Sequence, residues 1–371
     1  MATFGAFAKS FAEDTAPIPF PQVVKQNFSQ WDTDGDGKLS KDEIVAALSN
    51  RKIQGEAAAA IVAIAKIVRG DEYDLPPLTA TYLANCPLKT QKSSDEDEDS
   101  EDDASKPARS KSPPSFQPFY LVALKRLQST SRDLFPENAP SIKGIHQGLG
   151  DCTFVSTVGA LVYRNPAAVK AMFSQNDNGS ITVHLGNGDN IKIFVTDADI
   201  ALWTSAKTNG LWLTALEKAY RKSLVKTKHS DETSTKGLHL NGESRPNIYE
   251  KFSGPTIEIL AGHEIRSVKL NGMRPDSQQF SNLRRDLIAA QRDHLLIKAG
   301  KAKHAFAVLG YDKNQDLVHA WNPHGQDSIP NGPDSLQNGY TTRGGEFQIP
   351  LTDFIHFFVT VNFETQIPSR R

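Results

Sequence analysis

An acidic, serine-rich run divides this 371-residue chain and limits what it can fold into. Eight of the nine residues 95–103 are Asp or Glu, and the surrounding segment 89–115 contains no Val, Leu, Ile, Met or aromatic residue. Because burial of apolar surface is what offsets the entropy lost on ordering a chain, we expect this segment to be a solvated tether. The sequence therefore predicts two folded units, residues 1–88 and 116–366, followed by a short tail at 367–371.

The twelve residues 32–43 place oxygen ligands at the spacing of a calcium-binding loop. The pattern resembles the EF-hand, in which positions one, three, five, seven, nine and twelve supply the ligands and a glycine at six allows the turn. Four carboxylates with neutral oxygens suit a hard cation, so we expect calcium here; the alternative is a surface turn that binds nothing. The expected ligands are Asp32, Asp34, Asp36, Lys38 (through its carbonyl), Ser40 and Glu43.

Helices are expected on both sides of this loop, which makes residues 1–88 a small all-α module. Before the loop, apolar residues from Val23 to Trp31 recur three or four positions apart, and after it the segment 56–68 is rich in Ala and Ile. EF-hands normally pair. Residues 70–77 are acidic but lack the turn glycine and the closing Glu, so we expect at most a degenerate partner without metal.

The second unit changes its hydrophobic spacing along the chain. Helical patterns dominate its first part and alternating, strand-like patterns dominate its last part, which favours an α+β fold with two subregions and a cleft between them. The expected helices lie at 121–127, 153–163 and 211–224, and the expected strands at 180–185, 295–298, 305–309 and 357–361.

Cys152 stands directly before the apolar helix expected at 153–163 and after a glycine-rich turn. The positive end of a helix dipole lowers a thiol pKa, so we expect a nucleophilic thiolate. His304 opens one strand and Asn322 follows another, 317–320, so neighbouring strands would place both at one point. A thiol, an imidazole and a group that orients the imidazole are what a thiol hydrolase needs. Taken singly, such Cys and His residues are more often structural.

Five stretches together resemble the motifs of the calpain family of papain-like cysteine proteases, in the family's order. The resemblance covers residues 116–365, which corresponds to the whole catalytic core. It implies a papain-like two-lobed fold and hydrolysis of peptide bonds in protein substrates by a Cys-His-Asn thiol mechanism. The family's C-terminal β-sandwich and penta-EF-hand domain are not recognised. The five stretches are Gln147–Cys152, Trp212–Tyr220, Lys303–Phe306, Asn322–Gly325 and Gly345–Phe354.

Carried over residue by residue, the resemblance implies a role for each member of the set. Cys152 is the nucleophile, His304 is the general base and acid, and Asn322 orients the imidazole. Gln147 would donate its side-chain amide to the oxyanion hole beside the Cys152 backbone N–H. Gln147 stands one residue closer to the cysteine than is usual in the family, so His146 is the alternative occupant.

The sequence departs from the family next to these residues. Thr153 replaces the Trp that follows the nucleophile, and His324 replaces the Trp that shields the His–Asn hydrogen bond from water. Gly144 and Gly344 stand where the family's core carries calcium ligands. We therefore expect any calcium response to depend on the loop 32–43, held by a tether that does not dock it.

Three functions fit these residues. The first is an active endopeptidase. The second is a catalytically weak or inactive calcium-binding interaction protein with a decayed protease core, which the changes at Thr153 and His324 favour. The third is an acyl transferase that uses the same thiol–imidazole chemistry. Analysis of the products separates hydrolysis from transfer, and the reactivity of the thiol separates both from the decayed core.

The composition also bears on nucleic-acid partners, on the cellular compartment and on membrane insertion. The formal net charge is −1 and the basic residues do not cluster, so a nucleic-acid partner is not expected. Two cysteines cannot form a disulfide framework, which favours a reducing compartment. There is no apolar leader of signal-peptide length and no run long enough to span a membrane. We expect an intracellular, cytoplasmic protein that has no membrane insertion and no organic cofactor. The sequence does not predict its oligomeric state.

Overall fold

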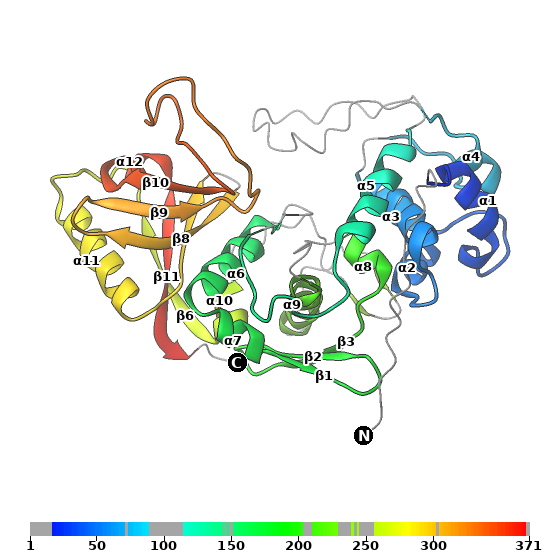
Figure 1. Cartoon of the computed structure of the whole chain (residues 1–371), viewed down its shortest axis with the longest axis horizontal. Helices are drawn as coiled ribbons and strands as arrows, with labels where there is room; N and C mark the ends of the chain where they lie inside the picture. Colours follow the sequence, from blue (N-terminus) through cyan, green and yellow to red (C-terminus); the bar gives the residue numbers. More distant parts are fainter. Residues whose placement is uncertain are drawn as a thin grey trace.

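The structure is a computed structural model that describes residues 17–70, 73–88, 114–143, 145, 147, 151–202, 210–228, 239–240, 243–244, 256–301 and 304–368. It is a mixed α+β protein with a group of N-terminal helices, a three-stranded antiparallel sheet and a six-stranded antiparallel sheet (Figure 1). The α+β class expected from the sequence is confirmed at this level. Most of the predicted tether 89–115 lies outside the described residues, as does the turn at 148–150.

The N-terminal helices pack around a shared apolar core. Apolar residues spaced three or four apart turn one face of the first helix inward, from Phe20 to Trp31, and the run Ala58–Ala65 of the third is buried. Ser40 and Glu43 cap the second helix with a capping box. The helices are α1 (Phe20–Trp31), α2 (Lys41–Ser49), α3 (Gly55–Gly70) and α4 (Ala80–Ala84).

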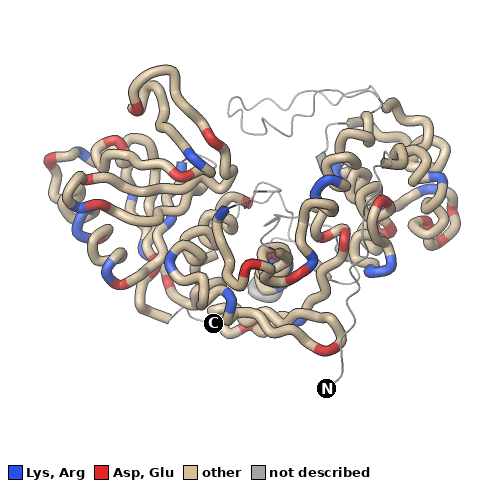
Figure 2. The backbone as a smooth tube through the Cα atoms, in the orientation of Figure 1, with Lys and Arg blue, Asp and Glu red and all other residues tan. Residues whose placement is uncertain are grey.

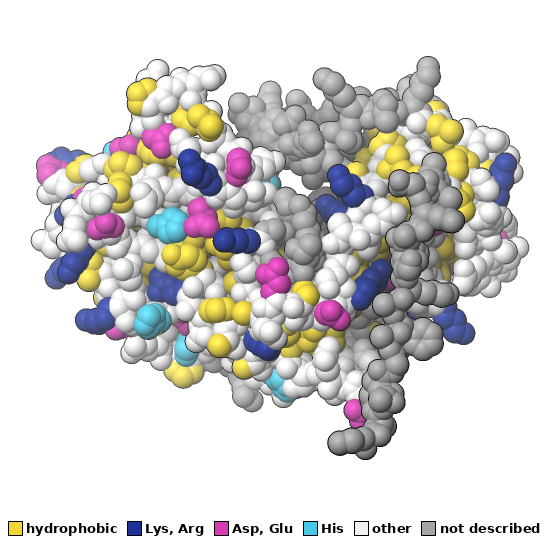
Figure 3. Space-filling view, viewed as in Figure 1, with side chains coloured by type: hydrophobic (Ala, Val, Ile, Leu, Met, Phe, Trp, Pro, Cys, Tyr) yellow, Lys and Arg dark blue, Asp and Glu magenta, His cyan; other side chains and the backbone are white. Residues whose placement is uncertain are grey.

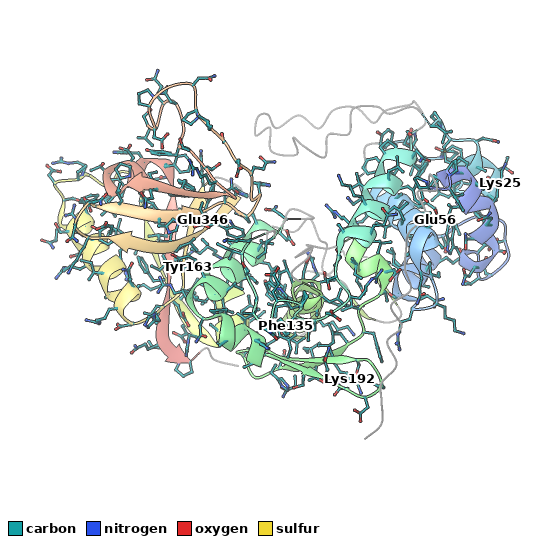
Figure 4. The ribbon with its side chains drawn as sticks, in the orientation of Figure 1. Lys25, Glu56, Phe135, Tyr163, Lys192 and Glu346 are labelled. Carbon is teal, nitrogen blue, oxygen red and sulfur yellow. The ribbon has the colours of Figure 1, made fainter. Side chains whose placement is uncertain are left out.

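The core of these helices continues across the boundary predicted at residue 116. Helices α5 (Gln117–Ser129) and α8 (Asp197–Leu202) contribute buried side chains to the same apolar cluster. The rings of Phe20 and Phe116 stack with centroids 5.2 Å apart. Glu56 of α3, labelled in Figure 4, accepts the N–H of Ile18 at 3.1 Å, and its charge helps to raise the pKa of Tyr120 of α5, after the larger effect of burial. The helical module is therefore docked, and does not hang only on a tether as the sequence suggested.

The middle of the chain packs helices over the three-stranded sheet β1-β2-β3. Phe154 and Tyr220 stack at 4.9 Å between the two longest of these helices. The predicted helices at 153–163 and 211–224 are confirmed. The elements are α6 (Cys152–Arg164), α7 (Pro166–Ala171), β1 (Phe173–Gln175), β2 (Ile181–His184), β3 (Asn190–Ile193), α9 (Trp212–Lys228), the ribbon β4 (His239–Leu240) and β5 (Glu243–Ser244), and α10 (Thr256–Ala261).

The C-terminal part is a six-stranded antiparallel sheet in the order β10-β9-β8-β7-β11-β6. The strand predicted at 357–361 begins only at Thr360, because the buried Leu351, Phe354 and Ile355 follow a helical spacing that carries a helix through Phe357. The elements are β6 (His263–Lys269), α11 (Gln278–Arg292), β7 (Ile297–Lys301), β8 (His304–Asp312), β9 (Leu317–Trp321), β10 (Glu346–Pro350), α12 (Leu351–Phe357) and β11 (Thr360–Pro368).

The surface of the molecule is mixed in character. Figure 2 shows basic and acidic residues interspersed along the described backbone, without a stripe of one sign. Hydrophobic side chains are exposed over the region of α4 and α5, at the upper right of Figure 3, and those exposed nearby include Leu88 and Leu121. Among the described residues, no helix combines the length and the apolar character that crossing a membrane requires.

Candidate active site and acidic loop

Cys152 is the first residue of α6 and is buried, with 7% of its surface exposed. The turn that starts the helix is closed by the Asp151 carbonyl, which accepts the N–H groups of Phe154 at 2.8 Å and Val155 at 3.0 Å. The backbone N–H of Ala305 hydrogen-bonds the thiol. Since Ala305 follows His304 in β8, the thiol lies at the start of the strand that His304 opens.

The environment of Cys152 does not produce the expected lowering of its pKa. Burial raises the pKa of the thiol, and the charge of Asp151 adds to this effect. Hydrogen bonds from Ala305 and Thr153 oppose the rise without reversing it. The direction predicted for the pKa from the helix start was therefore wrong, because burial of the thiol, which the sequence did not reveal, has the largest effect.

His304 and Asn322 come together at one end of the sheet. Strands β8 and β9 are antiparallel, so the start of β8 and the residue after β9 lie side by side. His304 Nε2 is 2.9 Å from Asn322 Oδ1, and the same oxygen accepts the backbone N–H of His324 at 3.1 Å. A backbone N–H only donates, which identifies this Asn322 atom as the oxygen. Nε2 of His304 therefore carries the proton, and its Nδ1 is the basic nitrogen.

His324 covers the His304 ring. The two imidazoles stack with centroids 4.6 Å apart and planes 16° apart, while Phe306 meets His304 edge-on at 4.8 Å. A flat ring thus lies beside the His304–Asn322 hydrogen bond, where the resemblance expects a Trp.

Two glycines fix how α6 and the Asn322 turn approach each other. A Cβ on Gly159 of α6 would lie 2.4 Å from the ring of Trp321, which ends β9. A Cβ on Gly345 would lie 2.3 Å from the Asn322 carbonyl oxygen. The Gly345 carbonyl in turn accepts the Asn322 N–H at 2.8 Å. Sequence reasoning used Gly345 only as part of a motif and missed the packing role of Gly159, although a glycine inside an apolar helix usually marks such a close approach.

Gln147 is half-buried, and its side-chain oxygen is buried without a hydrogen-bond partner among the described residues. Its neighbourhood contacts the loop after Asn322, because a Cβ on Gly325 would lie 2.9 Å from the Ile145 carbonyl oxygen. His146 and Gly144 lie outside the described residues. The choice between Gln147 and His146 for the oxyanion hole therefore stays a prediction.

The loop 32–43 brings Asp32, Asp34 and Asp36 together, with one oxygen of each within 4.8 Å of the others. Within the part of the chain that the structure describes, no other three His, Cys, Asp or Glu side chains meet in this way. Gly37 adopts a φ of 83°, as the sixth position of such a loop requires. The Lys38 ammonium lies 3.3 Å from an Asp36 oxygen.

Glu43 has both of its side-chain oxygens engaged by the loop itself. One oxygen accepts the N–H groups of Thr33 at 2.6 Å and Asp34 at 3.2 Å, and the other accepts the N–H of Ser40 at 2.9 Å and its hydroxyl at 2.8 Å. Burial alone would raise the pKa of Glu43, but these hydrogen bonds lower it to about 2. As a result, Ser40 and Glu43 act here as a helix cap, apart from the three aspartates.

The loop 32–43 also pairs with the connection between α3 and α4. Lys38 and Thr79 form an antiparallel bridge, and the Leu39 N–H donates to the Leu78 carbonyl at 3.1 Å. The segment predicted as a degenerate partner, 70–77, leads directly into this bridge, although residues 71–72 lie outside the described part. Two helix–loop–helix units are thus joined at their loops.

No family model and no curated protein matches this chain. What the described residues bring together is a buried thiol, an oriented histidine–asparagine pair and, separately, an acidic loop.

Proposed function

We propose that this protein is a calpain-like cysteine endopeptidase with a papain-like core, which carries calcium on an N-terminal EF-hand. The observation that supports the enzyme most strongly is the His304 Nε2–Asn322 Oδ1 hydrogen bond, 2.9 Å long, next to the strand start that contacts the Cys152 thiol. A nucleophile at a helix start, facing a histidine and an asparagine from an antiparallel sheet, is the arrangement expected of the two lobes of a papain-like fold.

In this proposal each residue has one chemical task. The Cys152 Sγ attacks the carbonyl carbon of the substrate, and Nδ1 of His304 takes the thiol proton and passes it to the leaving amine. Asn322 fixes the ring with Nε2 protonated, so that Nδ1 stays basic. Because burial raises the pKa of Cys152, the resting thiol is neutral and the proton moves as substrate is attacked. The backbone N–H of Cys152 and the amide of Gln147 are proposed to stabilise the oxyanion.

The calcium site is proposed for the same loop. The three converging aspartates, the Lys38 carbonyl and the Ser40 hydroxyl suit a hard cation that prefers oxygen ligands. The pairing of Leu39 with Leu78 supports an EF-hand pair, in which the second loop is degenerate. Glu43 fits only if it exchanges its backbone N–H partners for the metal, so binding would rearrange the start of α2.

A second candidate function is the weak or inactive interaction protein, and the raised pKa of Cys152 favours it. The proposed substrates are proteins, and the proposed location is the cytoplasm, because both cysteines are free and buried, as in a reducing compartment. Transfer of an acyl group would use the same thiol and is distinguished only by its products.

The test uses purified full-length protein and an unfolded protein substrate, with calcium or with a chelator. Cys152→Ala, His304→Ala and the matched control Cys86→Ala are compared with the original chain. Hydrolysis predicts new α-amino termini that disappear in the first two variants and persist in the control. If intact substrate is recovered at every calcium concentration, the inactive alternative replaces the proposal.

A further inference from the structure

Lys298 is a buried lysine that the mechanism above does not use. It lies in β7, which pairs directly with β8, and only 6% of its surface is exposed. Its ammonium donates to the hydroxyl of Thr256 at 3.0 Å. Thr256 begins α10 and is fully buried. Burying an ammonium group costs free energy of folding, so a buried lysine is expected to have a specific structural or functional role.

Lys298 is linked to the helix that carries the candidate nucleophile. The hydroxyls of Thr256 and Thr157 are 3.0 Å apart, and the Thr157 hydroxyl is 2.9 Å from the Thr153 carbonyl oxygen. A hydroxyl has one proton, and one arrangement uses every proton once: Lys298 donates to Thr256, Thr256 to Thr157, and Thr157 to Thr153. The chain of hydrogen bonds ends in the first turn of α6, one residue after Cys152.

Lys298 and the thiolate form of Cys152 attract each other. Burial lowers the pKa of Lys298 to about 8, and the charges of Glu258 and then Cys152 oppose that change. Below about pH 8 the lysine is mainly charged, whereas above it this attraction is lost. Burial raises the pKa of Glu258, which weakens the attraction between its carboxyl group and the Lys298 ammonium. The other titratable groups around the thiol are Asp151 beside it in the chain and His304 at the start of β8; on α9, Tyr220 faces Asp151 and Glu258.

We propose that Lys298 is a positioning residue for Cys152, which holds the first turn of α6 through Thr256 and Thr157 and places a buried positive charge near the nucleophile. This inference rests on the proposed function, since it assigns Cys152 the role of nucleophile. The ammonium stabilises the thiolate that forms during attack, which offsets part of the cost of burying the sulfur. Lys298 itself exchanges no proton with the substrate.

The experiment measures the alkylation rate of Cys152 in the full chain between about pH 5 and 10, with the modified peptide identified by mass spectrometry. Lys298→Gln retains the length and a hydrogen-bond donor but loses the charge, Lys298→Met loses both, and Lys298→Arg keeps the charge. Lys269→Met is the matched control, because Lys269 is an exposed lysine of the same sheet. At pH 7, where Lys298 is charged, we expect the Gln and Met variants to be alkylated about tenfold more slowly than the original chain, and this difference should shrink above about pH 8 as the lysine loses its charge. The Arg variant and the control should keep the original rate at pH 7.

Thermal unfolding separates this role from a structural one. Removal of a buried charge should leave the Met variant about as stable as the original chain. If Lys298 were needed only for folding, the Met variant would lose stability and keep the original alkylation rate at pH 7. If the Met variant does not fold, the Gln variant decides. Equal alkylation rates at pH 7 for the original chain and Lys298→Gln would overturn the inference. Alkylation needs no peptide substrate, so a failure to cleave proteins would count against the proposed function and not against this measurement.

Discussion

The imidazole of His324 lies flat on that of His304, with ring centroids 4.6 Å apart. The His304 ring thereby has an aromatic neighbour on one face, in the place where the family resemblance predicts a Trp. An imidazole is smaller than an indole, so it covers less of the His304–Asn322 hydrogen bond. The stack therefore makes residue 324 a test of how far that hydrogen bond must be shielded from water.

His324→Trp is expected to raise kcat/KM by roughly 3- to 10-fold, because the larger indole shields the His304–Asn322 hydrogen bond from water more fully. The measurement is kcat/KM for peptide hydrolysis. His356→Trp, at an exposed histidine of α12, is the control. An unchanged kcat/KM in His324→Trp would show that the stacked ring does not influence His304.

The sequence allowed the pairing of His304 with Asn322 to be predicted, because strand patterns fix which ends of adjacent antiparallel strands meet. It did not allow the pKa of Cys152 to be predicted. The helix start can be inferred from the sequence, but the burial that raises this pKa depends on how α6 packs against β8. The contact of Gly159 with Trp321 is likewise a tertiary feature, visible in the sequence only as an unusual glycine.

The docking of the N-terminal helices was missed for a different reason. An amphipathic pattern such as that of α5 shows that one face is buried but does not identify the element that covers it. The sequence of 89–115 suggested a tether. The helices that cover α5 precede this segment in the chain, so the sequence pattern did not connect them with α5. In the same way, the EF-hand spacing gave Glu43 as a metal ligand but could not show that its oxygens are held by Thr33 and Ser40.

Gly159→Ala is expected to destabilise the fold and to lower activity together. The added Cβ would lie 2.4 Å from the Trp321 ring, so α6 must move away from the strand that leads to Asn322. Overpacking of this kind typically costs about 1–3 kcal/mol. Gly310→Ala is the control, because its Cβ would meet its nearest atom at 3.4 Å. The free energy of unfolding and the rate of Cys152 alkylation are measured in both variants. A Gly159→Ala protein with unchanged stability would contradict this packing.

Glu43→Gln is expected to weaken calcium binding at least tenfold, or about 1.4 kcal/mol, because it removes the ligand that would chelate with two oxygens. The same change should alter acid stability. The pKa of Glu43 is about 2 in the fold against an ordinary 4.5, so the carboxylate stabilises the fold above about pH 4.5, and this stabilisation is lost as the pH falls toward 2. In the Gln variant this part of the pH dependence should disappear.

Calorimetric titration with calcium and unfolding followed at several pH values check both outcomes for Glu43. Asp42→Asn is the matched control, since Asp42 is the exposed acidic neighbour in the first turn of α2. If Glu43→Gln binds calcium as tightly as the original chain, the metal is held elsewhere. A stability curve that still falls between pH 4.5 and 2 in this variant would assign the acid sensitivity to other carboxylates.

The core shared by α1, α3, α5 and α8 leads to the last prediction, which concerns a fragment of residues 116–371. In that fragment, Phe116 and Tyr120 would lose the helices that bury them. Each such side chain contributes about 1.5–3 kcal/mol when buried. The carbonyl of Leu48, at the end of α2, also accepts the Thr196 hydroxyl at 3.2 Å.

Loss of these contacts would also disturb the active-site lobe. Asp199 accepts hydrogen bonds from Thr196 and from Lys218 of α9 at 2.6 Å, so the N-terminal helices support the helix that packs on α6. We expect the fragment to unfold at a lower temperature, to self-associate and to lose most of its activity, and we expect co-expressed residues 1–88 to restore it. Thermal unfolding, sedimentation and peptide hydrolysis are compared for the full chain, the fragment and the reassembled pair. A monomeric fragment with the stability and activity of the full chain would mean that the N-terminal helices contact α5 and α8 without stabilising them. Calcium bound at residues 32–43 would then have no contact through which to change the active site.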